Sequence, residues 1–281
     1  MAISLLNNVS ALEAQNELNV TQTNLQKTLF QLSSGSRINS GADDAAGLAI
    51  ANGLQANVTA LNQSASNAND GVGALQVSDG ALAQVTTLLN RAVTLATESA
   101  NGTVSDAQRT AINAEFTQIK AEIDRIGSST TFNGTSVFTS NATNIFLSDA
   151  SSTAANSTIS VTVGTLASTG IGYNGTTVNL SSDDLSSSGT ATTALNDINS
   201  AISNVAGLRG TIGAGINRLQ SAVNVINSQV QNLTAAQDQI TAANIPQQVT
   251  NLSEFSILNQ SGISALAQAN SAQQSILKLL Q

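Results

Sequence analysis

Residues 211–240 have the sequence TIGAGINRLQSAVNVINSQVQNLTAAQDQI, and their apolar side chains recur at spacings of three and four. The series consists of Ile212, Ile216, Leu219, Val223, Ile226, Val230, Leu233 and Ile240, with one gap of seven positions. This heptad pattern is typical of a helix that presents one apolar stripe to a partner helix. The stripe therefore predicts a second long helix elsewhere in the chain.

A matching stripe begins near Asp43 and continues without proline to about Ala100. One helix over this range would be roughly 80 Å long at 1.5 Å per residue, too long to bury its stripe alone. The next segment, residues 105–126, begins with a candidate cap, Ser105, and places Ile112 and Phe116 on one face. We expect it to fold back antiparallel on the first helix.

Both ends of the chain carry weaker apolar stripes. Their members include Leu25 and Leu29 at one end and Phe255, Leu258, Ile263, Leu266 and Ile276 at the other. The single proline, Pro246, predicts a break between two C-terminal helices. Between residues 131 and 192 the pattern changes to period-two runs separated by Asn-Gly turns. That segment predicts short β-hairpins followed by a polar linker to Thr193.

Together these patterns predict a mainly α fold. We expect a long antiparallel helical rod or coiled coil formed by the N- and C-terminal regions, with a short β-hairpin-rich central insert. The rod comprises residues 43–130 and 193–242, and the surface-exposed insert comprises residues 131–192.

Composition excludes several classes of function. Only 9% of residues are charged and the net charge is −8, so a nucleic-acid partner is not expected. The sequence has no Cys and no His, which removes the commonest metal ligands and general bases. We therefore predict no enzyme activity, metal or cofactor. No apolar run is long enough for a membrane span, and the N-terminus lacks a cleavable signal, a pattern compatible with export by a dedicated machine.

Between two helical patterns lies the stretch LSSGSRINSGADDAAGLAIANGLQ, residues 32–55. It contains several glycines, Arg37 and two aspartates, a composition that is also typical of anion-binding loops. Ser40 and Asp43 form a capping pattern, which predicts that Asp43 and Asp44 lie in the first turn of the long helix. The following Ala-Ala-Gly supplies no polar groups for catalysis. We expect Arg37 to pair with one of these carboxylates or with a neighbouring subunit.

The glycines of GLRGTIGAG, residues 207–215, imitate a dinucleotide-binding fingerprint, but they lie inside helical periodicity with no preceding strand. We interpret them as points of close approach between packed helices.

The chain resembles bacterial flagellin in the segments LSSGSRINSGADDAAGLAIAN, NANDG, DGAL, AEIDRI, FNGTSVF and ALAQANSAQQSILKLLQ. The resemblance implies that residues 1–42 and 243–281 pair as an inner coiled-coil domain, with residues 33–44 as the spoke, a structural joint to the rod. The short insert indicates a core-only flagellin without large outer domains. Apolar terminal stripes with little to cover them are expected to order on assembly.

The resemblance implies a structural subunit that self-polymerises into the helical flagellar filament for swimming motility, outside the cell. Expected partners are other copies of the chain, the type III export apparatus, hook-junction and cap proteins, and an export chaperone at the terminal stripes. A surface read by Toll-like receptor 5 maps to Arg91, Leu95 and Glu115, which an ordinary subunit contact explains equally well. Two alternatives share this architecture: a hook–filament junction protein and a coiled-coil adhesin stalk.

Overall fold

The structure is a computed structural model that describes residues 8–148, 157–173 and 175–279. Its helices are α1 (Val9–Ser34), α2 (Ala45–Ala100), α3 (Asp106–Ser129), α4 (Ser188–Thr241) and α5 (Ile245–Leu279). Short strands between α3 and α4 form antiparallel hairpins: β1 (Thr131–Phe132) with β2 (Thr135–Ser136), β3 (Thr143–Phe146) with β4 (Thr158–Val161), and β5 (Ile171–Tyr173) with β6 (Thr176–Val178). The predicted mainly helical class with a β-hairpin-rich insert is confirmed.

The chain divides into two compact units. One contains residues 1–56 and 232–281, and the other contains residues 57–231. The bounds of these units differ from those of the domains expected from the sequence. The division into an inner domain, a spoke and a rod stays a prediction.

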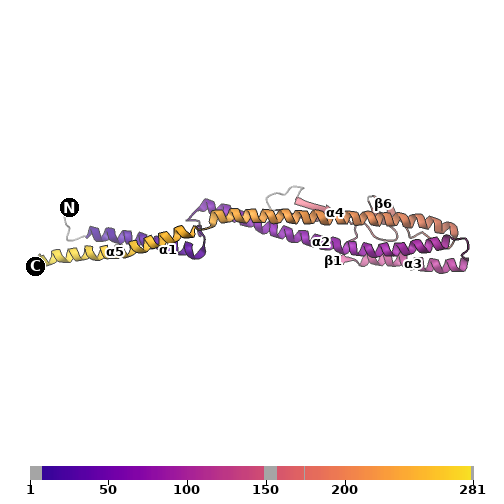
Figure 1. Cartoon of the computed structure of the whole chain (residues 1–281), viewed down its shortest axis with the longest axis horizontal. Coiled ribbons are helices and arrows are strands. Elements are labelled where there is room, and N and C mark those ends of the chain that lie inside the picture. The colour runs from indigo at the N-terminus through magenta and orange to yellow at the C-terminus, as the bar shows by residue number, and fades with distance from the viewer. Residues whose placement is uncertain (1–7, 149–156, 174, 280–281) are drawn as a thin grey trace. The chain divides into compact units, whose positions relative to one another are not determined.

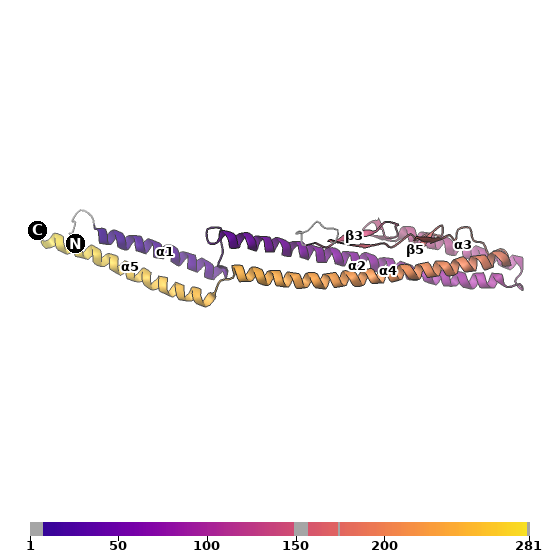
Figure 2. The ribbon, with the colours of Figure 1, turned by 90° about the horizontal axis from the view of Figure 1, so that it is seen from above.

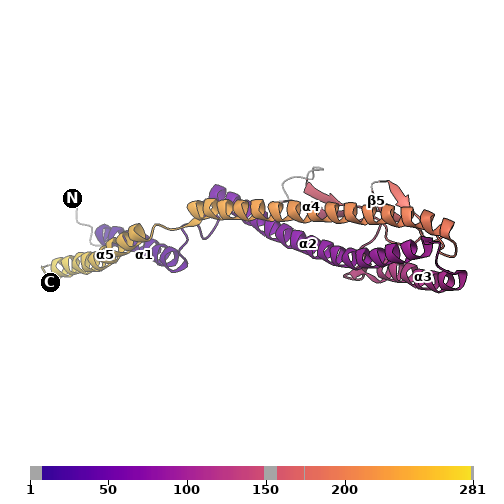
Figure 3. The same cartoon turned by 45° about the vertical axis from the view of Figure 1, so that its right-hand side comes forward.

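In the unit of residues 57–231, α2 and α4 lie side by side and α3 lies along the C-terminal part of α2 (Figures 2 and 3). The predicted stripes supply the core, which includes Leu75, Leu82, Val85 and Leu89 from α2, Ile112, Phe116, Ile119 and Ile123 from α3, and Ile198, Leu208, Ile212 and Leu219 from α4. Burial of these side chains removes apolar surface from water, which stabilises the packing of the three helices against one another. The α3 stripe is therefore confirmed.

Hairpin side chains pack on glycines of the long helices. A Cβ at Gly215 would lie 3.0 Å from Val161 of β4 and 3.2 Å from Leu75 of α2. One at Gly207 would lie 2.5 Å from the ring of Tyr173. The predicted close approach between packed helices is thus confirmed at Gly215, which meets Leu75 of α2 as well as β4, whereas at Gly207 the close neighbour is the β5–β6 hairpin and not a helix. The prediction is wrong at the helix's other two glycines in this motif, 210 and 213, which face open space.

The β1–β2 hairpin turns through Asn133 and Gly134, whose φ angles are 49° and 76°. Two left-handed residues between paired Phe132 and Thr135 are characteristic of a type I′ turn, the connection that Asn-Gly favours. The predicted Asn-Gly hairpin turn is confirmed here.

Helix ends follow local capping chemistry. Ser105 caps α3: its side chain accepts the Gln108 N–H, and the Gln108 side chain accepts the Ser105 N–H, as in a capping box. The polar linker predicted to reach Thr193 ends earlier, because Ser187 accepts the Thr190 N–H at 3.2 Å and starts α4 at Ser188.

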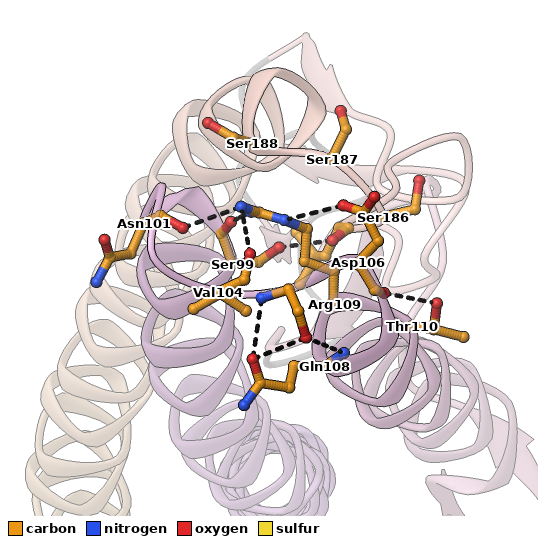
Figure 4. A network of polar contacts seen from close by, with 12 residues as sticks. Ser99, Asn101, Val104, Asp106, Gln108, Arg109, Thr110, Ser186, Ser187 and Ser188 are labelled. Carbon is orange, nitrogen blue, oxygen red and sulfur yellow. Dashed lines mark hydrogen bonds and ion pairs between the residues drawn. The ribbon is translucent and has the colours of Figure 1, made fainter.

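Arg109 is a buried cation that was not among the residues predicted to have a role. It is 5% exposed and donates to the main-chain carbonyls of Ser99, Asn101 and Val104 at the end of α2 (Figure 4). A positive charge at a helix C-terminus is favourable because the last carbonyls carry a partial negative charge. Arg109 therefore closes the turn between α2 and α3.

In the unit of residues 1–56 and 232–281, α1 and α5 lie side by side (Figure 1). The predicted break at Pro246 is confirmed: α4 ends at Thr241 and α5 begins at Ile245, which leaves proline in the first turn, where it is tolerated. Leu18 of α1 packs on Gly262 of α5, where an added Cβ would lie 3.3 Å from the leucine methyl. Two helices alone cannot enclose an apolar core, so the α1–α5 pair leaves large apolar side chains exposed.

Candidate assembly surfaces

Large exposed apolar side chains concentrate on α1 and α5. They are Val9, Leu12, Val20, Leu29 and Phe30 on α1, and Ile245, Val249, Ile257, Leu258 and Ile263 on α5. Phe30 is 62% exposed and Ile257 is 66% exposed. Many large apolar side chains exposed on the same pair of helices are expected where another molecule binds. We call the ten residues the α1–α5 apolar surface.

The predicted terminal seam divides between the inside and the outside of this helix pair. Leu25, Phe255 and Leu266 are half-buried, whereas Leu29, Leu258 and Ile263 are exposed. The side chain of Ile276 lies outside the described residues. Phe30 and Ile257 were missed, although a phenylalanine beside Leu29 in a polar helix is a visible signal. The predicted stripe captured the periodicity but not which members face solvent.

The joint between helices is built from the stretch that opens with Gly35. Ser36 and Ala242 form an antiparallel β-bridge, and the Ala243 N–H donates to Gly35 O at 2.9 Å. Arg37 adds two contacts to the end of α4: its N–H donates to Thr241 O at 2.6 Å, and Nη2 donates to Ile240 O at 2.9 Å. These bonds satisfy terminal carbonyls of α4 that have no partner within the helix.

The predicted pairing of Arg37 with Asp43 or Asp44 is wrong within the chain. Asp43 instead pairs with Lys27 Nζ of α1 at 2.7 Å, and its Oδ2 accepts the main-chain N–H groups of Asn39 and Ser40. The Lys27 ammonium, followed by the Asn39 N–H, lowers the pKa of Asp43 from 3.8 to about 2. Arg37 is drawn to α4 because unsatisfied helix carbonyls lie beside it.

The expected Ser40 cap is also wrong. Asp44 is the residue whose carboxylate accepts the Gly47 N–H, at 2.8 Å, just before α2 begins at Ala45. Asp43 and Asp44 therefore precede the helix rather than lying in its first turn. Asp43 closes its own turn by accepting the Ser40 hydroxyl at 3.1 Å. Two adjacent aspartates allowed both arrangements, and the sequence could not choose between them.

Arg91 of α2 and Glu115 of α3 form a bidentate ion pair, with Nε to Oε1 at 2.7 Å and Nη2 to Oε2 at 3.0 Å. The hydrogen bond from Arg91 lowers the pKa of Glu115, and Glu115 raises that of Arg91. Leu95 is only 1% exposed and belongs to the core. Its predicted place on an exposed receptor surface is wrong, because its side chain points between the packed helices.

The side chains of these surfaces are suited to binding another molecule. Within residues 8–148, 157–173 and 175–279, no group of three or more acidic, His or Cys side chains is placed to hold a metal ion. Among the helices described, none is both long and apolar enough to cross a membrane. What the geometry provides is an exposed apolar surface on α1 and α5 and a hydrogen-bonded joint beside it.

Comparison with known proteins gives the class of the chain. Residues 5–143 match the bacterial flagellin N-terminal helical region, and residues 195–280 match the bacterial flagellin C-terminal helical region. The chain belongs to the bacterial flagellin family. It is a structural subunit of the flagellar filament, exported outside the cell.

Individual relatives match over nearly the whole chain. Flagellin FlaB1 of Treponema pallidum is 32% identical and the flagellar filament 33 kDa core protein of Treponema phagedenis is 33% identical, each over 97% of this chain and 98% of the relative. Flagellin of Halalkalibacterium halodurans is 31% identical over the same shares. The crystal structure of Bacillus cereus flagellin covers 61% of this chain and 94% of its own, with 28% identity and a TM-score of 0.47.

Proposed function

We propose that the filament grows by burial of the α1–α5 apolar surface against other copies of the chain. The supporting observation is the exposure of ten large apolar side chains on two helices that cannot cover them. Each such side chain contributes roughly 1.5–3 kcal/mol when fully removed from water, so modest burial at many positions adds to a stable contact. A surface that repeats on every copy without closing a ring generates a helical polymer.

In this proposal, residues 1–42 and 243–281 form the inner assembly domain, and the spoke, residues 33–44, connects it to the rod. Arg37, Asp43 and Asp44 act there as structural residues. Arg37 holds the end of α4, Asp43 ties the spoke to α1 through Lys27, and Asp44 starts α2. Because each side chain bonds main-chain groups or a neighbouring helix, the joint has a defined path. We assign no catalytic role to the chain, whose family is structural.

We further propose that the type III apparatus exports the chain and that hook-junction and cap proteins contact the ends of the filament. An export chaperone would cover Leu258 and Ile263, because these exposed apolar side chains on α5 need protection before assembly. The same segment contains the half-buried Leu266 and, as the resemblance implies, Ile276. Deletion of residues 255–281 should abolish chaperone binding; undiminished affinity would overturn this assignment.

For Toll-like receptor 5, we propose that the accessible determinants are Arg91 and Glu115 without Leu95. The two charged side chains already satisfy each other, so a receptor must contact them as an ion pair or separate them. Arg91→Ala should reduce receptor binding measured with purified ectodomain and monomeric chain. Unchanged binding would leave these residues as an intramolecular clamp between α2 and α3.

Seeded growth tests the assembly proposal. Ile257→Asp places a charge in the α1–α5 apolar surface and should stop addition of monomer to short filament seeds, followed as pelletable protein. Asn199→Asp introduces the same charge at an exposed polar position of α4, outside this surface, and should grow normally. Equal growth of the two variants would contradict the proposal. Failure of the unaltered chain to grow would instead favour a junction protein or an adhesin stalk.

A further inference from the structure

The turn between α2 and α3 contains an Asn-Gly pair, Asn101 and Gly102. In such a pair the glycine main-chain nitrogen can attack the asparagine side-chain carbonyl carbon, because glycine has no side chain to obstruct the approach. Among the described residues two further Asn-Gly pairs begin at Asn52 and Asn133. The three pairs share a sequence but not a local geometry, so the structure ranks them.

At Asn101 the geometry favours attack. The Thr103 N–H donates to Asn101 Oδ1 at 3.2 Å, which forms an Asx turn and holds the side-chain carbonyl over the following peptide. A main-chain donor at that oxygen also stabilises the negative charge that develops on it during attack, as in an oxyanion hole. Asn101, Gly102 and Thr103 are all exposed, so water reaches the site.

The nucleophile is also available. In the part of the chain that the structure describes, the Gly102 N–H donates to no acceptor. A Cβ at Gly102 would meet no atom within 4 Å, so the loop has room for the small rotation that brings the nitrogen to the carbonyl carbon. No helix or strand hydrogen bond has to break first.

The other two pairs lack part of this arrangement. Asn52 lies inside α2, where the Gly53 N–H belongs to the helical hydrogen-bond ladder. Asn133 sits in the β1–β2 turn with φ of 49°, and within the described residues no group donates to its side-chain carbonyl. Asn133 therefore has the favourable sequence without the main-chain donor.

We propose that Asn101 is a site of spontaneous deamidation in the folded chain. The Gly102 nitrogen bonds to Asn101 Cγ, the Cγ–Nδ2 bond breaks, and Nδ2 leaves as ammonia with the proton from the Gly102 N–H. One water then opens the cyclic imide. Opening at Cγ gives aspartate, and opening at the main-chain carbonyl carbon gives isoaspartate, in which the chain runs through the former side chain.

The modification changes the contacts that close the α2–α3 turn. Asn101 O accepts from Arg109 Nη2 at 3.0 Å and from the Val104 N–H at 3.2 Å (Figure 4). In isoaspartate this oxygen becomes part of a free carboxylate and leaves the main chain. Either product adds a negative charge beside the buried Arg109 guanidinium. Because the reaction needs no enzyme, the product accumulates with the age of the subunit.

Peptide mapping by mass spectrometry tests the ranking. The folded full-length chain is incubated in mildly alkaline buffer, and Asn, Asp and isoAsp are quantified at the three positions. We expect Asn101 to convert at least about tenfold faster than Asn133, the effect of one well-placed donor on the barrier, and Asn52 to stay intact. In denaturant the three rates should converge. Conversion of Asn133 or Asn52 as fast as Asn101 in the folded chain would overturn the proposal.

Variants of the donor separate geometry from sequence. Thr103→Pro removes the donated N–H and should slow conversion of Asn101 about tenfold, whereas Thr103→Ala keeps that N–H and should leave the rate unchanged. Gly102→Ala fits the open space and should also slow attack, with helicity confirming that the chain remains folded. Equal rates for the proline and alanine variants at position 103 would contradict the assigned role of the donor.

Discussion

Asp43 is the side chain whose surroundings alter its chemistry most clearly. Lys27 and two main-chain N–H groups hold its pKa at about 2, below its usual 3.8. Since the folded pKa is the lower one, the ionised carboxylate stabilises the fold above about pH 4. That contribution is lost as the pH falls through about 2. The spoke is therefore expected to weaken in acid.

Lys27→Met tests this ion pair. The variant should raise the pKa of Asp43 toward its usual value, because the nearest positive charge is gone while the main-chain donors remain. Its stability deficit relative to the native chain should be present near neutrality and disappear as the pH approaches 2. NMR titration and denaturant unfolding measure the two effects. Lys27→Arg retains the charge and serves as the control; a deficit that is independent of pH would contradict the assignment.

Gly127 is required for packing rather than for backbone freedom. It lies in α3, and a Cβ there would collide with the main-chain oxygen of Leu166. We expect Gly127→Ala to destabilise the chain by about 1–3 kcal/mol, the usual cost of overpacking. Gly80→Ala, in α2, meets open space and should stabilise it by up to about 1 kcal/mol. Thermal unfolding of the two variants measures these changes in stability. A shift of the melting temperature in the same direction for both variants would contradict the prediction.

At the level of elements, the caps explain where helices begin. The Ser105–Gln108 capping box starts α3, and its removal by Ser105→Ala should lower the free energy of unfolding by about 0.5–2 kcal/mol. Ser105→Asp restores an acceptor for the first turn and should recover most of this loss. Denaturant unfolding compares the three chains. If alanine and aspartate behaved alike, the cap would not be what stabilises this end of α3.

Elements with a strong local signal could be predicted from the sequence. The heptad stripe of α4, the Ile112–Phe116 face of α3 and the Asn-Gly turn before β2 each depend on neighbours a few positions away. The start of α2 could not be predicted, since Asp43 and Asp44 compete for one capping role and the outcome depends on Lys27 from another helix. Contacts distant in sequence decide such cases.

For the candidate surfaces, periodicity located the apolar positions but not their exposure. Leu95 and Phe30 both follow helical spacing, yet Leu95 is buried in the core of residues 57–231, whereas Phe30 is exposed on α1. Burial depends on how many elements converge, which the sequence of one helix does not state. Arg109 shows the same limit, because its three carbonyl partners come from the end of α2 and the following turn.

At the scale of the whole molecule, one unit has its own apolar core, whereas the α1–α5 helix pair is expected to need other copies of the chain to cover its apolar side chains. Residues 57–231 enclose an apolar core, whereas ten large apolar side chains of α1 and α5 are exposed. Contacts between copies are therefore expected to contribute more to the order of α1 and α5 than to that of α3.

Hydrogen exchange of the monomer and of the filament, resolved by peptide, tests this most directly. Polymerisation should slow exchange strongly across α1 and α5 as the α1–α5 apolar surface is buried, while the core peptides of α3 around Phe116 should change little. Exchange in α1 and α5 that is the same in monomer and filament, with new protection confined to residues 57–231, would contradict the account.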